Sequence, residues 1–309
     1  MSDARVVLAL DVGGTGMKCA LVAPDGTVRH AERHPTLAGR GPRAVVANIL
    51  QIAADLAATA RTDGLDPLAV GVAVPGVVDE AGGVAVWSAN VGFRDVPLRQ
   101  LIADRLGLPA ALGHDVRAGG LAEARRGAGR GRRHALFVAI GTGIAAALVV
   151  DGSGFPGAHG AAGELGHIVV RPGGTPCGCG ARGCLEAEAS ARAIGRRYAG
   201  LAGKPATTAF DVVTRAEAGD PVAGAVWREA VGALADGLVT AQALYDVDVL
   251  VVGGGLAEAG DALLVPLRSA FGERVTFHRK PEIVRAELGD SAGCVGAALL
   301  ALDHLERAG

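Results

Sequence analysis

The chain has 309 residues, and its 30 basic and 32 acidic side chains give a net charge of −2 at neutral pH. Half of its residues are hydrophobic and 20% are charged, which supports a folded core and excludes a disordered chain. A charge this close to zero gives no general attraction to nucleic acid or to an anionic membrane. Glycines and a threonine interrupt the longest apolar run, residues 136–150, before it reaches the ~18 to 20 residues that cross a bilayer. With no charged leader at the start, these features predict a soluble, cytoplasmic protein.

Strands and helices alternate through the first half of the chain, which predicts one α/β domain. A glycine-rich turn joins the first two predicted strands, and His114-Asp115 starts the last helix. The predicted elements of this half are strands over residues 5–10, 18–22, 69–74 and 110–112 and helices over 43–60, 98–106 and 114–126.

The second half also opens with two strands around a glycine-rich turn, so we predict a duplicated architecture, although no sequence repeat is visible. An arginine-rich stretch, residues 125–133, separates the halves, and we interpret it as a solvated loop rather than a phosphate or nucleic-acid patch. A loop-rich region covers residues 151–183. The remaining predicted elements are strands over 135–140, 145–150 and 247–252 and helices over 186–199, 222–245 and 292–307.

The turn between the first two strands, residues 11–18 (DVGGTGMK), is a candidate phosphate site. Its glycines let backbone N–H groups converge on an oxyanion, and Thr15 and Lys18 can add donors. A plain hairpin could have the same glycines. Asp11 favours the phosphate site, because a carboxylate at the end of an apolar strand is costly unless it serves a cation or a hydrogen-bond network.

Two further glycine clusters are candidates for nucleotide binding. Gly141-Thr142-Gly143 follows an apolar strand as a dinucleotide fingerprint does, but that motif must open a helix. Residues 147–152 predict a short strand and a turn instead, so a second phosphate-binding hairpin fits better. Gly253-Gly254-Gly255 follows a buried strand and either lets a flat ligand such as adenosine approach the backbone or serves packing alone.

Histidine and cysteine crowd together in the loop-rich region. The residues are His167, Cys177, Cys179 and Cys184. A tetrahedral zinc site with one imidazole and three thiolates fits this set, and a redox disulfide or unliganded thiols are the alternatives. With four protein ligands, the zinc would shape the loop rather than activate water. Glu164 and Glu186 flank the loop, as functional groups or as surface carboxylates, whereas Cys19 and Cys294 are expected to be buried in the core.

Five motifs occur in a recognisable order: DxGGTxxK, a GTG hairpin, ExGH, CxCGxxGCxE and a late GGG. This order, from Asp11 to about Gly255, resembles the ROK family (repressor, open reading frame, kinase), whose sugar kinases belong to the actin-like ATPase superfamily. The resemblance implies an α/β fold of the two-lobed, actin-like (ribonuclease H-like) type, with a central cleft for ligands and a zinc-stabilised loop. It implies a smaller lobe of residues 1–117 and 293–309. Residues 118–292 would form a larger lobe that carries the zinc loop and a dimerisation surface.

The resemblance also implies roles for single residues. Asp115 would be the catalytic base, which accepts the proton of the sugar 6-hydroxyl. The residues implied in sugar binding are Asn90, His114, Asp115, Glu164, His167 and Glu186. Those implied in binding ATP and Mg²⁺ are Asp11, Gly13, Gly14, Thr15, Lys18, Gly141, Thr142, Gly143, Gly253, Gly254 and Gly255. A structural Zn²⁺ would be held by His167, Cys177, Cys179 and Cys184.

His114 departs from the family pattern, which usually has Asn-Asp where this chain has His114-Asp115. Histidine can still donate a hydrogen bond to a sugar, but it is bulkier, and with an ordinary pKa of about 6.5 it can carry charge beside the carboxylate. It could also be a plain helix-start residue.

The resemblance predicts an ATP-dependent kinase for the 6-hydroxyl of a hexose, with glucose as the expected acceptor. An N-acetylhexosamine or glucosamine is the alternative acceptor, and a non-catalytic sugar sensor is the alternative of another class. The expected partners are a hexose and a nucleotide, without nucleic acid or membrane, in a homodimer or a tetramer.

Overall fold

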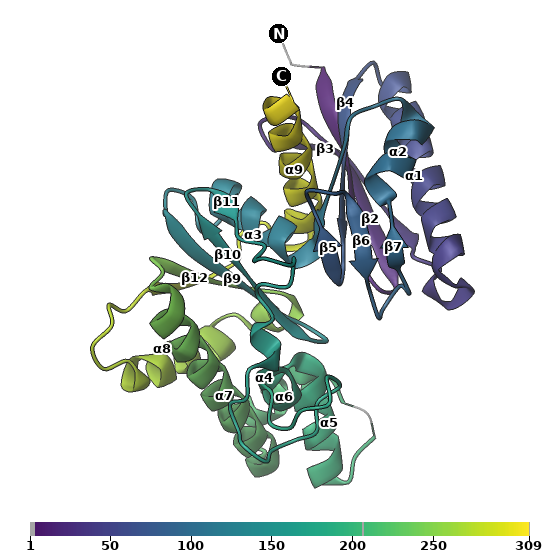
Figure 1. Ribbon diagram of the computed structural model, residues 1–309. Helices are drawn as coiled ribbons and strands as arrows, with labels where there is room; N and C mark the ends of the chain where they lie inside the picture. Colours follow the sequence, from purple (N-terminus) through teal and green to yellow (C-terminus); the bar gives the residue numbers. More distant parts are fainter. Residues whose placement is uncertain (1–3, 206, 309) are drawn as a thin grey trace. The chain divides into compact units, whose positions relative to one another are not determined.

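Two five-stranded sheets organise the chain, and each is the core of a separate structural unit (Figure 1). The computed structural model describes residues 4–205 and 207–308. The first unit contains the chain up to residue 126, the segment 153–162 and the residues from 290 onward. The second contains residues 127–152 and 163–289.

The sheet of the first unit has the strand order β3-β2-β1-β4-β8. Its strands are β1 (Arg5–Val12), β2 (Gly16–Val22), β3 (Val28–Pro35), β4 (Asp66–Val74) and β8 (Ala110–His114). β1 pairs antiparallel with β2 and parallel with β4, which pairs parallel with β8. A separate small sheet consists of β5 (Val77–Asp79), β6 (Val84–Trp87) and β7 (Arg94–Val96).

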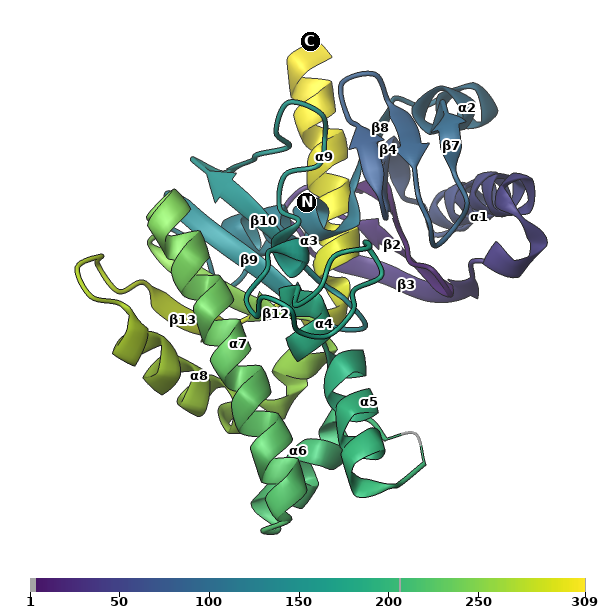
Figure 2. The same ribbon diagram turned by 60° about the horizontal axis from the view of Figure 1, so that its bottom comes forward.

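Helices cover both faces of the first sheet (Figures 1 and 2). They are α1 (Pro42–Thr62), α2 (Leu98–Leu106), α3 (Asp115–Arg126) and α9 (Ala292–Ala308). Successive residues of a strand point to opposite faces, so Val6, Leu8 and Leu10 of β1 join the core under α1 and α2. Val7 and Ala9 join the core under α3 and α9. The buried stripe of α1 packs in the first of these cores, so α1 is a core helix although its length and composition would suit a membrane span.

Small residues let α9 approach its neighbours closely. A Cβ on Gly71 would lie 1.8 Å from the carbonyl oxygen of Ala297, and one on Gly296 would lie 1.9 Å from that of Ala118. These contacts hold α3 in the first unit, so the lobe boundary that the resemblance implies after residue 117 falls inside this helix. The structure differs from that division in three places: the chain leaves the first unit after Arg126, residues 153–162 return to it, and it resumes at Asp290 rather than at 293. Residues 1–3 and 309 of the expected lobe lie outside the described residues.

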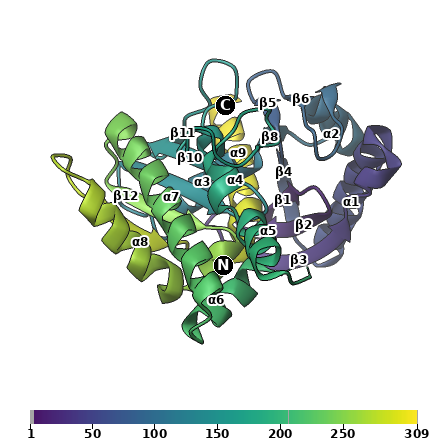
Figure 3. The ribbon, with the colours of Figure 1, turned by 90° about the horizontal axis from the view of Figure 1, so that it is seen from below.

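The sheet of the second unit has the order β11-β10-β9-β12-β13. Its strands are β9 (His134–Ile140), β10 (Ile144–Val150), β12 (Val249–Gly253) and β13 (Glu282–Arg285), with the two-residue β11 (Ser153–Gly154) at the edge. The helices are α4 (Leu185–Ala189), α5 (Ala191–Ala202), α6 (Ala209–Glu217), α7 (Pro221–Tyr245) and α8 (Asp261–Arg274). α7 and α8 lie side by side and share one core with β9 and β12 (Figure 3).

The two sheets repeat one pattern. Each begins with an antiparallel hairpin, β1–β2 or β9–β10, and its first strand pairs in parallel with a later strand, β4 or β12. A second parallel strand, β8 or β13, follows in each sheet. The duplicated α/β architecture predicted from the two glycine-rich hairpins is therefore present in the fold.

Candidate functional site

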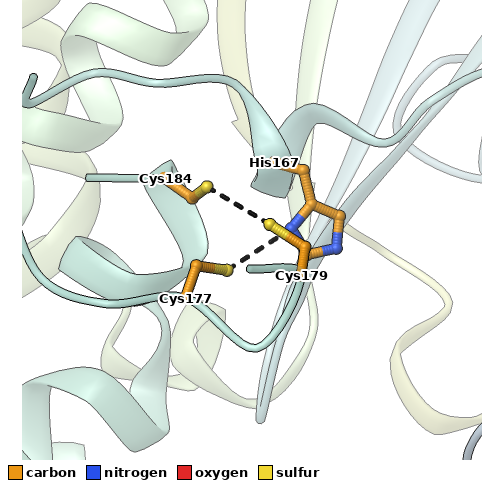
Figure 4. Close-up of side chains that lie close together, drawn as sticks. All are labelled: His167, Cys177, Cys179 and Cys184. Carbon is orange, nitrogen blue, oxygen red and sulfur yellow. Dashed lines mark hydrogen bonds between the residues drawn. The ribbon is translucent and has the colours of Figure 1, made fainter. Parts of the chain in front are cut away.

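The predicted zinc ligands converge in the second unit (Figure 4). The ligand atoms of His167, Cys177, Cys179 and Cys184 all lie within 4.8 Å of one another. Nδ1 of His167 is 3.6 Å from Sγ of Cys177, and Sγ of Cys179 is 3.7 Å from Sγ of Cys184. Metal–sulfur bonds of about 2.3 Å and metal–nitrogen bonds of about 2.0 Å give a tetrahedron with edges of about 3.5–3.8 Å. The sulfur separation is also far too long for a disulfide, so the donor set fits a structural zinc ion.

Tight turns bring these ligands together. Gly183 has a φ of +75°, and a Cβ there would lie 1.6 Å from the carbonyl oxygen of Arg171, so the chain can cross itself only at a glycine. Cys184 follows at once and is fully buried. Burial raises the pKa of the Cys184 thiol to about 12, whereas the Ala181 N–H lowers the pKa of Cys179. A bound cation is what would keep the buried Cys184 ionised.

Glu186 links the zinc cluster to the second glycine turn. Its Oε2 accepts a hydrogen bond from the Ile144 N–H at 3.1 Å, and a Cβ on Gly143 would lie 2.4 Å from the same oxygen. The Ala191 N–H, at the start of α5, donates to the carbonyl oxygen of Gly141 at 2.9 Å. The turn Gly141-Thr142-Gly143 therefore lies directly against Glu186.

Glu164 also lies beside the cluster, with Oε2 3.8 Å from Nε2 of His167. The three glycines at the end of β12 differ in how closely other atoms surround them. A Cβ on Gly253 would lie 2.5 Å from the Phe137 ring, and one on Gly254, where φ is +79°, would lie 2.5 Å from the Ile140 carbonyl oxygen. Packing accounts for both of these glycines. A Cβ on Gly255 would meet open space within the described residues, which leaves its backbone accessible to a ligand.

The first glycine turn is held firmly within the first unit. The Gly13 N–H donates to the Gly16 carbonyl oxygen at 2.9 Å, and the Thr36 hydroxyl donates to the Gly13 carbonyl oxygen at 2.7 Å. The Thr36 N–H also donates to the carbonyl oxygen of Thr15 at 3.0 Å. A Cβ on Gly14 would lie 3.4 Å from Cβ of Asn90, so the predicted sugar ligand Asn90 lies beside this turn.

Lys18 has an acidic partner that the sequence analysis did not identify. Its Nζ donates to Oδ1 of Asp290 at 2.9 Å, and Arg33 pairs with the other carboxylate oxygen. Both cations lower the pKa of Asp290, which keeps this carboxylate charged. Asp290 lies 272 residues along the chain from Lys18 and belongs to no motif, so the sequence offered no signal for the pair.

Asp11 lies near the end of β1, where burial disfavours a charged carboxylate. Burial raises its pKa to about 6, the charge of Asp115 adds to the rise, and Lys18 opposes it. A Cβ on Gly293, at the start of α9, would lie 2.2 Å from Oδ2 of Asp11, so glycine is needed there. A buried carboxylate of this kind suits a divalent cation, which would restore its ionised form.

We expect Asp11→Asn to stabilise the ligand-free protein at neutral pH. The folded Asp11 keeps its proton up to about pH 6, whereas an unfolded aspartate loses it near pH 4. The free energy of unfolding of the wild type therefore falls as the pH rises through this window, and asparagine removes that loss. Because the site is partly solvated, we expect a gain of about 1–2 kcal/mol at pH 7 and none below about pH 4. Melting temperatures at both pH values test this, and an equal difference at both would contradict it.

His114 and Asp115 occupy the junction of β8 and α3. Oδ1 of Asp115 accepts a hydrogen bond from the Val116 N–H at 2.7 Å and lies 3.3 Å from Nε2 of His114. Burial raises the pKa of Asp115, while the Val116 N–H and the Arg117 charge lower it. The side chain of His114 is 9% exposed, and its Nδ1 accepts a hydrogen bond from the Arg117 N–H at 3.4 Å, so His114 also acts as a helix-start residue that caps α3.

The predicted site residues fall into two groups. The first unit brings together the first glycine turn, Asp11, Asn90, His114 and Asp115, and the second unit brings together the GTG turn, Glu164, Glu186 and the zinc ligands. Three further residues beside these groups, Asp290, Glu80 and Arg117, belong to no sequence motif.

Comparisons with known proteins identify the family. The family model described as "ROK family" matches residues 7–304. A glucokinase from Thermotoga maritima is 33% identical over 315 aligned residues, which cover 97% of this chain and 98% of that protein. An N-acetylmannosamine kinase from Shigella flexneri is 33% identical over 299 residues, 96% of this chain and 98% of that protein. A solved ROK family glucokinase from Streptomyces griseus, in complex with glucose and AMPPNP, aligns with a TM-score of 0.81 and 30% identity, over 96% of this chain and 99% of that one. The chain belongs to the ROK family.

Proposed function

We propose that this chain is an ATP-dependent hexose kinase that transfers the γ-phosphoryl group to the 6-hydroxyl of glucose. The observation that carries the proposal is the partly buried carboxylate of Asp115, which lies in the unit that also holds Asp11 and the first glycine turn. The similarity to a named glucokinase along nearly the whole chain supports glucose as the acceptor. The glucokinase bound to glucose and AMPPNP supports ATP as the donor.

In the proposed reaction, Asp115 accepts the proton of the sugar 6-hydroxyl while that oxygen bonds to the γ-phosphorus. The bond from the γ-phosphorus to the bridging oxygen breaks, and ADP leaves. The raised pKa of Asp115 brings this base closer to neutral pH, which favours proton transfer. Backbone N–H groups of the two glycine turns would bind phosphate oxygens. Asp11 would hold the Mg²⁺ of the nucleotide, which neutralises phosphate charge when bound.

The proposal assigns the sugar hydroxyls to polar side chains of both units. These are Asn90, His114 and Asp115 from the first unit and Glu164, His167 and Glu186 from the second. Zinc on His167 and the three cysteines would fix the loop that carries Glu164 and Glu186, because four protein ligands leave no open coordination position. We further propose a soluble, cytoplasmic homodimer, with a tetramer as the alternative, and a dimerisation surface on the second unit.

N-acetylmannosamine is the second candidate acceptor, because a kinase for that sugar is also 33% identical to this chain. ADP release with Mg²⁺-ATP would be measured against glucose, mannose, fructose, glucosamine, N-acetylglucosamine and N-acetylmannosamine. We expect the highest kcat/KM with glucose. A preference for an N-acetylated hexose would change the acceptor, and no turnover together with measurable sugar binding would favour a non-catalytic sugar sensor.

A further inference from the structure

A partly buried ion pair lies close to the proposed base, in contact with the neighbouring His114. Arg117, in the first turn of α3, is 4% exposed, and its Nε donates to Oε1 of Glu80 at 2.9 Å. Its Nη1 donates to the carbonyl oxygen of Gly160 at 3.0 Å. Glu80 belongs to the turn after β5, so one guanidinium ties three separate segments of the first unit together.

His114 is held by two contacts, one from the side chain of Glu80 and one from the backbone of Arg117. Oε1 of Glu80 accepts a second hydrogen bond, from the His114 N–H at 3.2 Å. The Arg117 N–H donates to Nδ1 of His114 at 3.4 Å. Residue 114 and residue 117 are both tethered, and Asp115 lies between them.

These contacts also determine the form of the His114 imidazole. Because Nδ1 accepts a hydrogen bond, the proton of the neutral ring resides on Nε2. Nε2 lies 3.3 Å from Oδ1 of Asp115 and can donate to it. The Val116 N–H donates to that same oxygen at 2.7 Å. With two donors directed at Oδ1, Oδ2 is the oxygen that takes the proton of an acceptor hydroxyl.

We infer that the side chains of Glu80 and Arg117 are positioning residues for phosphoryl transfer, which fix the backbone of His114 and the start of α3 so that Oδ2 of Asp115 is directed to the acceptor hydroxyl. The inference rests on the proposed kinase function. The pair acts through His114 and the backbone, and it does not touch the substrate.

Stability alone does not account for this pair. An ion pair of this kind contributes little net stability compared with apolar side chains of similar size, because the buried Arg117 charge must leave water and Glu80 is partly desolvated. Moreover, Nη2 of Arg117 is buried without a hydrogen-bond partner in the part of the chain that the structure describes, which is a further cost. The Glu80–Arg117 pair therefore lowers the stability of the fold, and we attribute its presence to the orientation of the neighbouring base, Asp115.

The test compares Arg117→Met, Arg117→Lys and Glu80→Gln with the wild type. The matched control is Arg125→Met, which breaks another ion pair of the same helix, with Asp303 at 2.7 Å, on a residue outside the proposed site. For each protein, kcat and KM for glucose and for ATP are measured together with the melting temperature. Displacing a base by about 1 Å costs about 10²-fold in rate, so we expect Arg117→Met to lower kcat about 10- to 100-fold with little change in the KM for ATP.

The conservative variants separate positioning from folding. Glu80→Gln keeps an acceptor oxygen for the His114 N–H and should retain most of kcat, whereas Arg117→Lys loses the forked contact and should lose about fivefold or more. Arg125→Met should keep the wild-type kcat. If Arg117→Met does not fold, the kcat of Arg117→Lys relative to the wild type tests the positioning role instead.

An active wild type whose folded Arg117 variants keep kcat within about twofold would overturn the positioning role and leave the kinase function intact. A wild type that phosphorylates no hexose would overturn the proposed function, and the positioning role with it.

Discussion

Asp115→Asn is expected to lower kcat for glucose phosphorylation by about 10²- to 10⁴-fold, the usual contribution of a positioned general base. Asparagine has the same shape and can still accept the hydrogen bond from the Val116 N–H, but it cannot take the proton of the 6-hydroxyl. The KM for ATP and the zinc content should not change. The measurement is a coupled ADP-release assay on purified wild-type and variant proteins.

The folding of this variant provides an internal control. Because burial raises the pKa of Asp115, the charged form is disfavoured in the folded protein, so asparagine should leave the melting temperature equal or higher. The matched control is Asp104→Asn on α2, whose carboxylate accepts a hydrogen bond from Gln100 on an exposed surface. It should retain the wild-type kcat. If Asp115→Asn kept kcat within tenfold of the wild type, Asp115 would not be the base.

Cys184→Ser is expected to abolish stoichiometric zinc binding and to destabilise the second unit. Cys184 is fully buried beside Cys179, so its loss removes one corner of the tetrahedron and leaves three ligands. Zinc sites of this type contribute about 10–16 kcal/mol in small zinc-finger peptides, so even a fraction of that energy would lower the melting temperature strongly. Because Glu186 follows two residues later, kcat should fall as well. Metal analysis, thermal unfolding and the kinase assay measure the three effects.

The control for zinc content is Cys19→Ser, which alters a buried cysteine of the first unit, outside the cluster. Its zinc content should equal that of the wild type. A zinc-free wild-type protein that unfolds at the same temperature with and without added zinc would contradict the structural role of the ion.

Much of the fold could be predicted because strands, helices and turns carry local signals. The predicted helix 98–106 coincides with α2, and most of the other predicted helices and strands differ by a few residues at their ends. The predicted helix 186–199 is divided into α4 and α5, since Ser190 adopts an extended conformation and caps α5 through its side chain. A helical pattern after the glycine triplet was expected without bounds, and the structure has α8 there, with Pro266 inside it.

Only part of the candidate site could be predicted from the sequence. The cysteine cluster and the glycine turns could be found because their residues lie close together in the sequence and have spacings that chemistry requires. Contacts between residues far apart in the sequence have no motif or spacing that could predict them. Lys18 and Asp290 are 272 positions apart, and Glu80 and Arg117 are 37 positions apart, so only the folded chain shows that they pair.

The most direct test of the central claim is the identity of the product that the wild-type protein makes from glucose and Mg²⁺-ATP. Glucose 6-phosphate can be detected by coupling to its dehydrogenase, with ADP quantified in the same reaction. We predict equal amounts of ADP and glucose 6-phosphate, and the loss of both in Asp115→Asn. Release of ADP without glucose 6-phosphate, or no ADP with any hexose of the panel, would contradict it.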